Sequence, residues 1–220
     1  MYHNTVHTGE AMIEDLRRDL QGEEFDYPLL MSYLQKYKNP RNKINRLLQS
    51  ESIIRIKKGI YVFGPKYRKG PICQELLANW IYGPSYISSH YALSHYGLIP
   101  ERVTTVTSMT SRKDKYFTTP VGNFSYKYIG LKKYIIGIRQ VQPSPFHTYL
   151  IATPEKALCD LIAHEPRLGT YNEIEPHLFE NLRIDVDELA KFDLRLIDKI
   201  QQSYHNHNLN LLYQFLKDTL

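Results

Sequence analysis

Cysteine is scarce in this chain, and long apolar runs are absent. Cys73 and Cys159 are its two cysteines, too few and too far apart for a disulfide framework or a zinc knuckle. No apolar run approaches the roughly 18 residues that a membrane-spanning helix needs. The acidic, polar start lacks the basic region and apolar stretch of a signal peptide. We therefore expect a cytoplasmic protein that contacts no membrane and binds no metal, with both thiols buried.

The loops that mark nucleotide-binding enzymes are also missing. The sequence contains neither the glycine-rich dinucleotide fingerprint nor the P-loop pattern, and it contains no HExxH pair. Serines, histidines and acids are common, but no spacing orders them as a catalytic triad. The sequence therefore predicts no enzymatic activity and no cofactor.

Positive charge is concentrated in one short part of the chain, residues 27–70, which we call the basic module. It contains eleven Lys or Arg and a single acid, Glu51, whereas the segment before it carries net charge −5 and the segment after it is neutral. Net charge +10 on about a fifth of the chain is typical of a surface that neutralises phosphates and releases their counterions. On charge alone, a merely solvated basic face explains the pattern equally well.

Apolar spacing and capping residues predict three helices in the N-terminal third, at about 10–20, 27–37 and 40–50. Asp26 followed by Tyr27 and Pro28 is typical of a helix start, and so is Asn39 followed by Pro40. The second and third helices are joined so tightly that they must cross steeply.

The helix expected at 40–50 separates an apolar face from a polar face. Ile44, Leu47 and Leu48 share one side. Asn and Gln can pair with adenine and Arg with guanine, and cations at the helix start can reach phosphates. No Glu occurs between Gln35 and Ser50, so a merely solvated amphipathic helix is less favoured. We predict that bases are read by Asn42, Asn45, Arg46 and Gln49, and that Arg41 and Lys43 contact phosphates.

Two β-rich runs follow, at 53–56 and 60–63, separated by Lys57, Lys58 and Gly59. A glycine at this turn permits the positive φ of a hairpin. Lysines at the hairpin tip are placed for phosphate contact, together with Arg55. Helix, turn, helix and two strands in this order predict a winged helix-turn-helix DNA-binding domain over residues 1–70.

Residues 64–71 have the Gly, Pro and charge content of a linker. Beyond them we predict a second domain, 71–220, of mixed α and β structure, so that the whole chain is of the α+β class. Helices are expected at 72–81 and 88–96, from Thr153 onward, and in a helical tail over 173–219. A largely antiparallel sheet is expected from strands at 103–109, 115–117, 124–129, 134–138 and 148–151.

Two other classes of function stay open. In the first, the second domain is a nuclease or transferase that the winged helix delivers to DNA. Paired acids beside a lysine would mark such a site, and Asp114–Lys115 and Glu155–Lys156 are fragments of it. In the second, the basic module binds RNA as a regulator, although aromatic residues on its strands are limited to Tyr61 and Phe63.

Histidine offers weak candidates for a catalytic or metal site. His90 and His95 are five apart, which does not place two ligands on one helix face. Asp160 and His164 have i, i+4 spacing, which is common in helices. His205 and His207 lie in a polar stretch typical of a loop or a helix cap. We predict no metal site and no catalytic residue among them.

Three stretches together resemble the AbiEi antitoxin family, the regulatory half of a type IV toxin–antitoxin (abortive infection) system. They are IIRIKKGIYVFG (53–64), SYISSHYALSHYGLIP (85–100) and ATPEKALCDLI (152–162). The resemblance spans most of residues 10–165, whereas residues 170–220 match nothing specific.

The resemblance implies a winged helix that binds inverted repeats in double-stranded DNA of its own promoter. It also implies a C-terminal antitoxin domain that counters a nucleotidyltransferase-like toxin without forming a stable complex with it. Two copies are expected on such an operator, because a paired site normally takes a pair of winged helices. The charge and helix patterns support DNA binding, and the antitoxin role comes from the resemblance.

Overall fold

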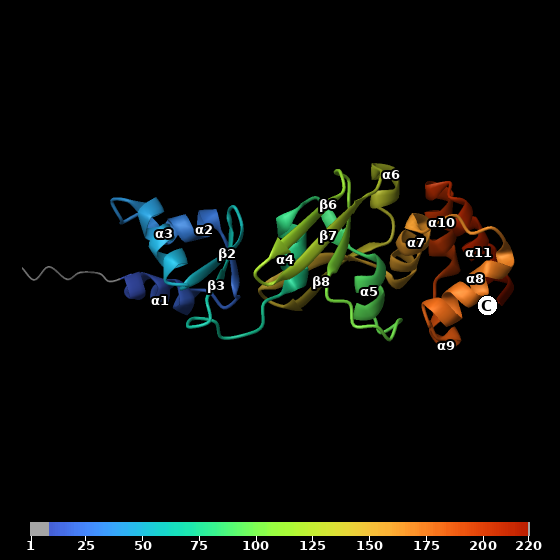
Figure 1. The fold of residues 1–220 in the computed structure, drawn as a ribbon, viewed down its shortest axis with the longest axis horizontal. Coiled ribbons are helices and arrows are strands. Elements are labelled where there is room, and N and C mark those ends of the chain that lie inside the picture. The colour runs from blue at the N-terminus through green and yellow to red at the C-terminus, as the bar shows by residue number, and fades with distance from the viewer. Residues whose placement is uncertain (1–8, 220) are drawn as a thin grey trace, which may run out of the picture.

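Helices and strands alternate along an elongated molecule of mixed α and β structure, as the sequence predicts (Figure 1). The computed structural model describes residues 9–219, so the first eight residues of the predicted 1–70 domain and the last residue of 71–220 lie outside the described residues. The basic module lies at one end, a six-stranded sheet lies in the middle, and a group of helices forms the other end. Within the described range, no helix combines the length and apolar character needed to cross a bilayer.

The N-terminal part consists of three helices and a small sheet. Its elements are α1 (Gly9–Asp19), β1 (Glu24–Asp26), α2 (Tyr27–Leu34), α3 (Pro40–Gln49), β2 (Ile53–Lys57) and β3 (Ile60–Phe63). The three strands pair antiparallel in the order β1-β3-β2. Strand β1 was not predicted from the sequence, because two of its three residues, Glu24 and Asp26, are acids, which are uncommon in strands.

Capping residues explain where α2 and α3 begin. The Asp26 side chain accepts a hydrogen bond from the backbone N–H of Leu29 at 2.9 Å, which satisfies one of the free donors at the start of α2. Asn39 holds the corresponding position before α3, but its side chain makes no capping hydrogen bond. The start of α3 is therefore favoured by Pro40, whose ring presets the helical φ, and not by a side-chain cap.

One face of each N-terminal element enters a shared hydrophobic cluster. Leu30 and Leu34 come from α2, and Ile44 and Leu47 come from α3. Phe63 of β3 is fully buried between them and α1. The polar sides of α2 and α3 are consequently turned to solvent.

The central sheet is built from two stretches of chain separated by helices. After α4 (Gln74–Ile81) come β4 (Ser85–Ile87), α5 (Ser89–His95), β5 (Val106–Thr110), β6 (Lys115–Thr119), β7 (Gly122–Tyr128), α6 (Leu131–Tyr134), β8 (Ile138–Ser144), β9 (His147–Ala152) and α7 (Pro154–His164). The strand order is β6-β7-β5-β4-β9-β8. We call residues 74–164 the sheet body.

The sheet is mixed, so the prediction of a largely antiparallel sheet is only partly correct. Strands β4 and β9 pair in parallel, and so do β5 and β7, while the other three pairings are antiparallel. The prediction of a strand at 134–138 is wrong. Residues up to Tyr134 form α6, and β8 begins only at Ile138, because Gly137 turns the chain with φ +73°.

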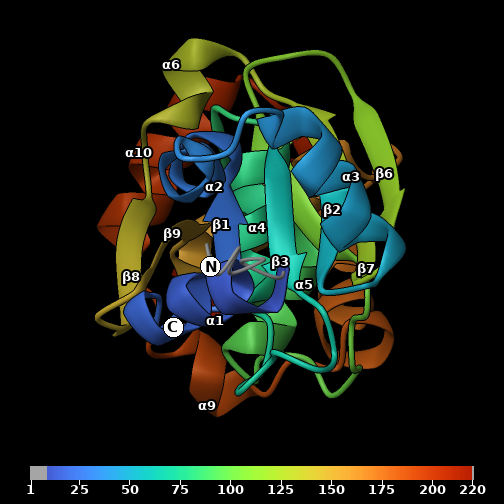
Figure 2. The same cartoon turned by 90° about the vertical axis from the view of Figure 1, so that its left-hand side faces the viewer.

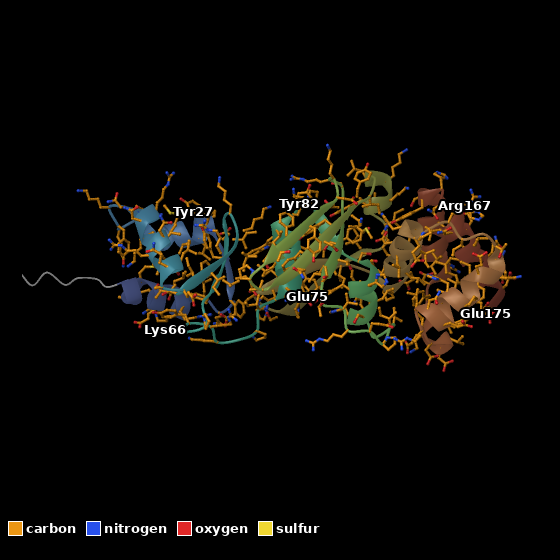
Figure 3. All side chains as sticks on the ribbon, viewed as in Figure 1. Tyr27, Lys66, Glu75, Tyr82, Arg167 and Glu175 are labelled. Carbon is orange, nitrogen blue, oxygen red and sulfur yellow. The ribbon has the colours of Figure 1, made fainter. Side chains whose placement is uncertain are left out.

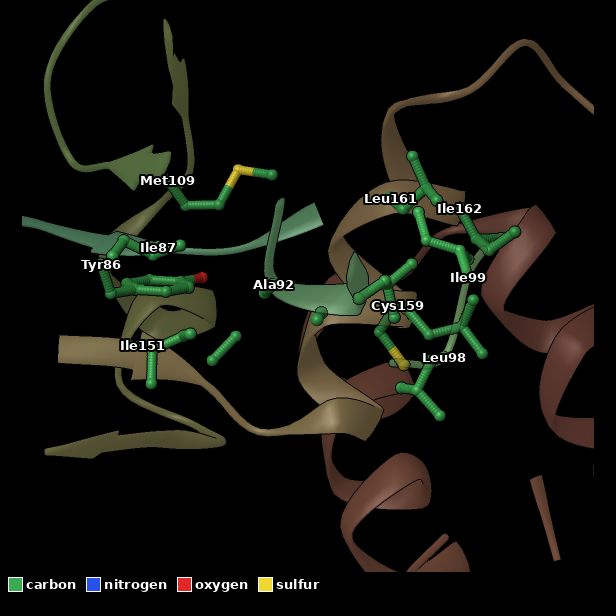
Figure 4. Packing of buried hydrophobic residues seen from close by; sticks show 14 of the residues in the cluster. Tyr86, Ile87, Ala92, Leu98, Ile99, Met109, Ile151, Cys159, Leu161 and Ile162 are labelled. Atoms are coloured by element: carbon green, nitrogen blue, oxygen red, sulfur yellow. The ribbon is translucent and has the colours of Figure 1, made fainter. Parts of the chain in front are cut away.

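Helices cover the sheet and extend the molecule at its C-terminal end. Figure 4 shows Cys159, Leu161 and Ile162 of α7 close to Leu98 and Ile99, which follow α5. Beyond α7 lie α8 (Ile174–Pro176), α9 (Val186–Leu189), α10 (Leu194–Tyr204) and α11 (His207–Thr219), with a 3-10 turn at Tyr171–Glu173 and a π turn at His177–Asn181. We call residues 165–219 the helical end.

The β2–β3 hairpin belongs to two hydrophobic clusters at once. Ile53, Tyr61 and Phe63 face the N-terminal cluster. Ile56 and Ile60, together with Val62, face the larger cluster of the sheet body. The hairpin therefore packs against the sheet body instead of projecting freely.

The cysteines differ in their surroundings. Both are free thiols, and Cys159 is buried as predicted, whereas Cys73 is only partly buried. Burial still raises the pKa of Cys73 to about 12.

Candidate nucleic-acid interface

Helix α3 presents a continuous polar face to solvent. Because Ile44 and Leu47 are buried on its inner side, the side chains opposite them are exposed. The four side chains predicted to read bases all lie on this outer face and are exposed: Asn42, Asn45, Arg46 and Gln49. Arg41 and Lys43 lie on the two flanks of the face, one to each side.

A groove of about 880 Å³ separates the Arg41 flank of α3 from the hairpin turn. It is lined by Tyr27, Arg41, Ile44, Asn45, Arg55, Lys58, Gly59 and Tyr61. The structure thus brings together four predicted site residues from two separate elements. Figure 3 labels Tyr27, which marks the α2 side of this groove.

Local geometry holds the hairpin side of the groove in place. Gly59 has φ +89°, the positive value predicted for the turn, and it allows Lys58 to stand at the hairpin tip. The Arg55 guanidinium lies 5.9 Å from the centre of the Tyr61 ring, within the range of a cation–π contact. Arg55 and Lys58 are both exposed at the groove.

The opposite flank of α3 borders a separate hollow of about 300 Å³, which Lys43 and Arg46 line together with Tyr67. The Lys43 ammonium lies 5.2 Å from the centre of the Tyr37 ring. Partial burial, and to a smaller extent the charge of Arg46, lower the pKa of Lys43. The site residues of α3 therefore divide between two sides, with Asn42 and Gln49 on the outer face between them.

Lys57 does not join the other predicted phosphate contacts. Its ammonium donates a hydrogen bond to the backbone carbonyl of Ile81, the last residue of α4. It also lies 5.9 Å from the Tyr82 ring centre and 5.1 Å from that of Phe117. The pairing of β2 with β3 shifts register between Arg55 and Lys57, so Lys57 does not share the side on which Arg55 lines the groove.

In the described part of the chain, the cations around the groove form no ion pairs with acids, and this includes Arg41, Arg55 and Lys58 as well as Arg46 of α3. Uncompensated positive charge around a concave surface concentrates a field that attracts polyanions. The arrangement can accept phosphates on the hairpin side and present amide and guanidinium groups along α3.

Two aromatic residues that line the groove, Tyr27 and Tyr61, were not among the site residues predicted from the sequence. Tyr27 precedes Pro28 at the start of α2, and Tyr61 lies on the strand after the turn. The sequence feature that could have identified them is a tyrosine next to the predicted basic residues. A tyrosine has an apolar ring and a polar hydroxyl, and both suit a hydrated interface.

The histidine pairs do not assemble a site. The His164 ring lies 2.8 Å from the backbone carbonyl of Asp160 and makes no contact with its carboxylate. His205 ends α10 with φ +48°, the helix-cap role considered for it. Among residues 9–219, no three His, Cys, Asp or Glu side chains are grouped so that they could hold a metal ion.

A buried ion pair in α7 belongs to a charged cluster that sequence reasoning missed. Lys156 and Asp160 are fully buried and lie 3.1 Å apart. The Lys156 ammonium also donates to the Lys133 carbonyl at 2.7 Å and to the Tyr204 hydroxyl. Asp160 accepts hydrogen bonds from three hydroxyls, those of Tyr86, Ser88 and Tyr204. Because every charged group has partners, the cluster ties α7 to β4, α6 and α10.

Burial governs the titration of this cluster. It lowers the pKa of Lys156, an effect that the neighbouring Asp160 carboxylate opposes, and it raises the pKa of Tyr204. The i, i+4 spacing of Lys156 and Asp160, with apolar residues between and after them, was the available signal in the sequence.

Comparisons with known proteins add a fold relationship. No protein-family model matches the chain, and no curated protein matches it. Its fold is similar to that of the RV2827C protein from Mycobacterium tuberculosis, known from a crystal structure, with a TM-score of 0.56 and 14% sequence identity. The similarity covers 96% of this chain and 80% of the mycobacterial chain. At this identity the similarity shows a shared fold alone.

Proposed function

We propose that residues 10–68 form a winged helix-turn-helix that binds double-stranded DNA, and that the chain is a transcriptional autorepressor and antitoxin. The order α1-β1-α2-α3-β2-β3 supports the first part, because a helix pair followed by a β hairpin is the arrangement of this motif. In it, α3 is the recognition helix and the β2–β3 hairpin is the wing.

The observation that carries DNA binding is the groove shared by α3 and the hairpin. Two cations of the hairpin, Arg55 and Lys58, face Arg41 and Asn45 of α3 across it. A recognition helix that enters the major groove would place its outer face on base edges while the hairpin contacts the adjacent backbone.

The roles divide by position. Asn42, Asn45, Arg46 and Gln49 read bases, since they occupy the exposed face of α3. The phosphates are held by Arg41, Lys43, Arg55 and Lys58. Lys57 is removed from this set because its ammonium is bound to the Ile81 carbonyl.

The antitoxin role rests on the three stretches that resemble the AbiEi family. Two of them meet in the structure: Tyr86 and Ser88 of the second stretch donate to Asp160 of the third. The Tyr96 hydroxyl of the second also donates to the Ala152 carbonyl at 2.7 Å. The second and third stretches thus form one connected part of the sheet body.

A salt titration on duplex and single-stranded probes tests DNA binding. We expect the full chain to bind a duplex of its own promoter more tightly than the single strand, with an affinity that falls steeply as salt rises. Lys58→Ala should flatten the salt slope by about one unit on every duplex. Duplex binding that is absent, or indifferent to salt, would refute the proposal.

The antitoxin role is tested by co-expression with a nucleotidyltransferase-like toxin encoded beside the gene. We expect growth to recover when the chain is supplied from a promoter that it does not regulate, so that repression and neutralisation are separated. The double variant Arg41→Ala/Lys58→Ala should lose DNA binding and still restore growth. If this variant and the wild type both fail to restore growth, the antitoxin role is wrong and DNA regulation alone is left.

A further inference from the structure

A second cationic cluster lies beside the hairpin turn, outside the groove of α3. The Tyr82 ring is its centre: the Arg112 guanidinium lies 5.7 Å from the ring centre, and the Lys57 ammonium lies 5.9 Å from it. Lys115 is near enough that its charge, after burial and the charge of Arg112, contributes to lowering the pKa of Lys57. Cations from the hairpin and from the β5–β6 turn therefore lie close together around the Tyr82 ring.

The one acid in this turn already has hydrogen-bond partners outside the cluster. Asp114, the acid of the β5–β6 turn, accepts a hydrogen bond from the Lys127 ammonium at 3.0 Å and another from the Tyr128 N–H at 2.8 Å. Arg112, Lys113 and Lys115 are exposed, and none of them forms an ion pair in the described part of the chain.

The turn also borders a hollow that can receive a ligand. It has a volume of about 660 Å³ and is lined by Tyr82, Ser111, Arg112, Lys113, Asp114 and Tyr128. Figure 3 labels Tyr82, on the hairpin side of this hollow. A concave surface with exposed cations, an engaged acid and aromatic rings is chemically suited to phosphate groups.

We propose that Arg112, Lys113 and Lys115 form a second phosphate-binding site, which contacts the backbone of the same duplex beyond the winged helix. This inference rests on the proposed DNA binding. Lys58 lines the first groove and Lys57 contacts Tyr82 beside the second hollow, so the two hollows flank one hairpin turn. Figure 2 shows α3, β2 and β6 on the same side of the long axis. A duplex seated on α3 and the hairpin would continue along the β5–β6 turn.

Overall charge had concealed this site. Residues 71–220 are neutral in sum, yet the turn reads Arg-Lys-Asp-Lys over 112–115. Its single acid is bound from outside the turn, by Lys127 and the Tyr128 N–H. The neutral sum over residues 71–220 therefore conceals cations that the sheet body offers to DNA.

The test uses the full chain and a labelled 30-base-pair duplex of mixed sequence, with anisotropy measured over a range of salt concentrations. We expect Arg112→Ala/Lys113→Ala to weaken binding about tenfold at low salt and to flatten the salt slope by about two units, one for each lost phosphate contact. The matched control, Arg195→Ala/Lys199→Ala, removes the same two residue types from exposed positions on α10. It should bind as the wild type does.

Three further outcomes separate the explanations. If the wild type does not bind the duplex, the proposed function fails, and this inference fails with it. If Lys58→Ala weakens binding while Arg112→Ala/Lys113→Ala does not, only the second site is refuted. If that double variant instead loses binding of free ATP in calorimetry and keeps duplex affinity, the site takes free nucleotide phosphates and its assignment to DNA is overturned. Lys115→Ala, which alters a single exposed side chain, should flatten the slope by about one unit and serves as the second variant.

Discussion

The exposed cations of the basic module and the buried Lys156–Asp160 cluster of the sheet body differ in how their charges are compensated. The module leaves Arg41, Arg46 and Lys58 exposed and unpaired with any carboxylate in the described residues. The sheet body buries Lys156 and Asp160 completely and gives each several partners. Exposed cations without partners cost little in water and are available to a ligand, whereas a buried pair is stable only when its hydrogen bonds are complete. The first pattern belongs to a binding surface, and the second belongs to a structural joint.

The strongest way to break this comparison is to remove one half of the buried pair. Asp160→Ala leaves the Lys156 ammonium in the core without its carboxylate, so we expect a loss of about 3–5 kcal/mol in the free energy of unfolding. Urea unfolding followed by the fluorescence of Trp80, the one tryptophan, measures it.

Glu188→Ala is the matched control, because it removes one carboxylate of the exposed pair with Lys191. Exposed pairs contribute below about 1 kcal/mol. If the two substitutions cost the same, the buried cluster does not have the structural role assigned to it.

Alkaline pH should weaken the sheet body through its buried tyrosines. Burial raises the pKa of Tyr86 and Tyr126, and of Tyr204 on α10, and it raises that of Tyr149 to about 12. Above about pH 10 the unfolded chain loses phenolic protons that the folded chain keeps, so stability falls as pH rises. The expected slope is about 1.4 kcal/mol per pH unit for each such tyrosine. Urea unfolding at pH 8, 10 and 11, followed by Trp80 fluorescence, would show it, and equal stability at all three values would contradict the expectation.

The proposed base-reading face of α3 predicts a difference between sequence-specific and general binding to DNA. Arg46→Ala should cost about 1–3 kcal/mol on the operator and relax sequence preference, because a guanidinium can pair with guanine. Lys58→Ala should weaken operator and random duplexes alike. Competition between the two duplexes measures the ratio, and equal losses on both for both variants would remove the proposed division of labour.

The smallest effect is expected at the contact between the two regions. Lys57→Met keeps an unbranched apolar side chain and removes the ammonium that lies over the Phe117 ring and donates to the Ile81 carbonyl, at the negative end of α4. We expect a loss of about 1 kcal/mol, or about 2–4 °C in Tm. Lys58→Met on the other side of the turn should leave Tm unchanged, and a similar fall for both variants would show that the contact adds no specific stability.

Local patterns predicted much of the basic module because its elements are consecutive and their signals are local. Asp26 with Pro28 marked α2, Pro40 marked α3, and Gly59 marked the hairpin turn. The position of Lys57 was not predictable in this way, since its partner Ile81 belongs to a helix that local patterns cannot place beside the hairpin.

The sheet body was less predictable for the same physical reason. Its two parallel pairings, β4 with β9 and β5 with β7, join strands that are not consecutive in the chain, and no local alternation encodes them. Ile135 and Ile136 suggested a strand. They instead follow the short helix α6, which begins after Gly130, and they precede the turn at Gly137. Ile135 is 75% exposed. The Lys156–Asp160 spacing was visible, but its partners Tyr86 and Tyr204 come from other elements.

Two buried acids, one directly before β1 and one at its first residue, restrict how the regions can move. Glu23 accepts hydrogen bonds from the backbone N–H groups of Lys69 and Gly70, at 3.1 and 2.9 Å, and Glu24 accepts one from Cys73. His147 of β9 lies 3.1 Å from the Glu24 carboxylate, so the sheet body also contacts β1 directly. If the basic module occupies an operator half-site, the helical end is then carried at a fixed angle around the duplex axis. Two copies on one operator would keep their helical ends in a set rotational phase, which insertion of about five base pairs, half a helical turn, would reverse.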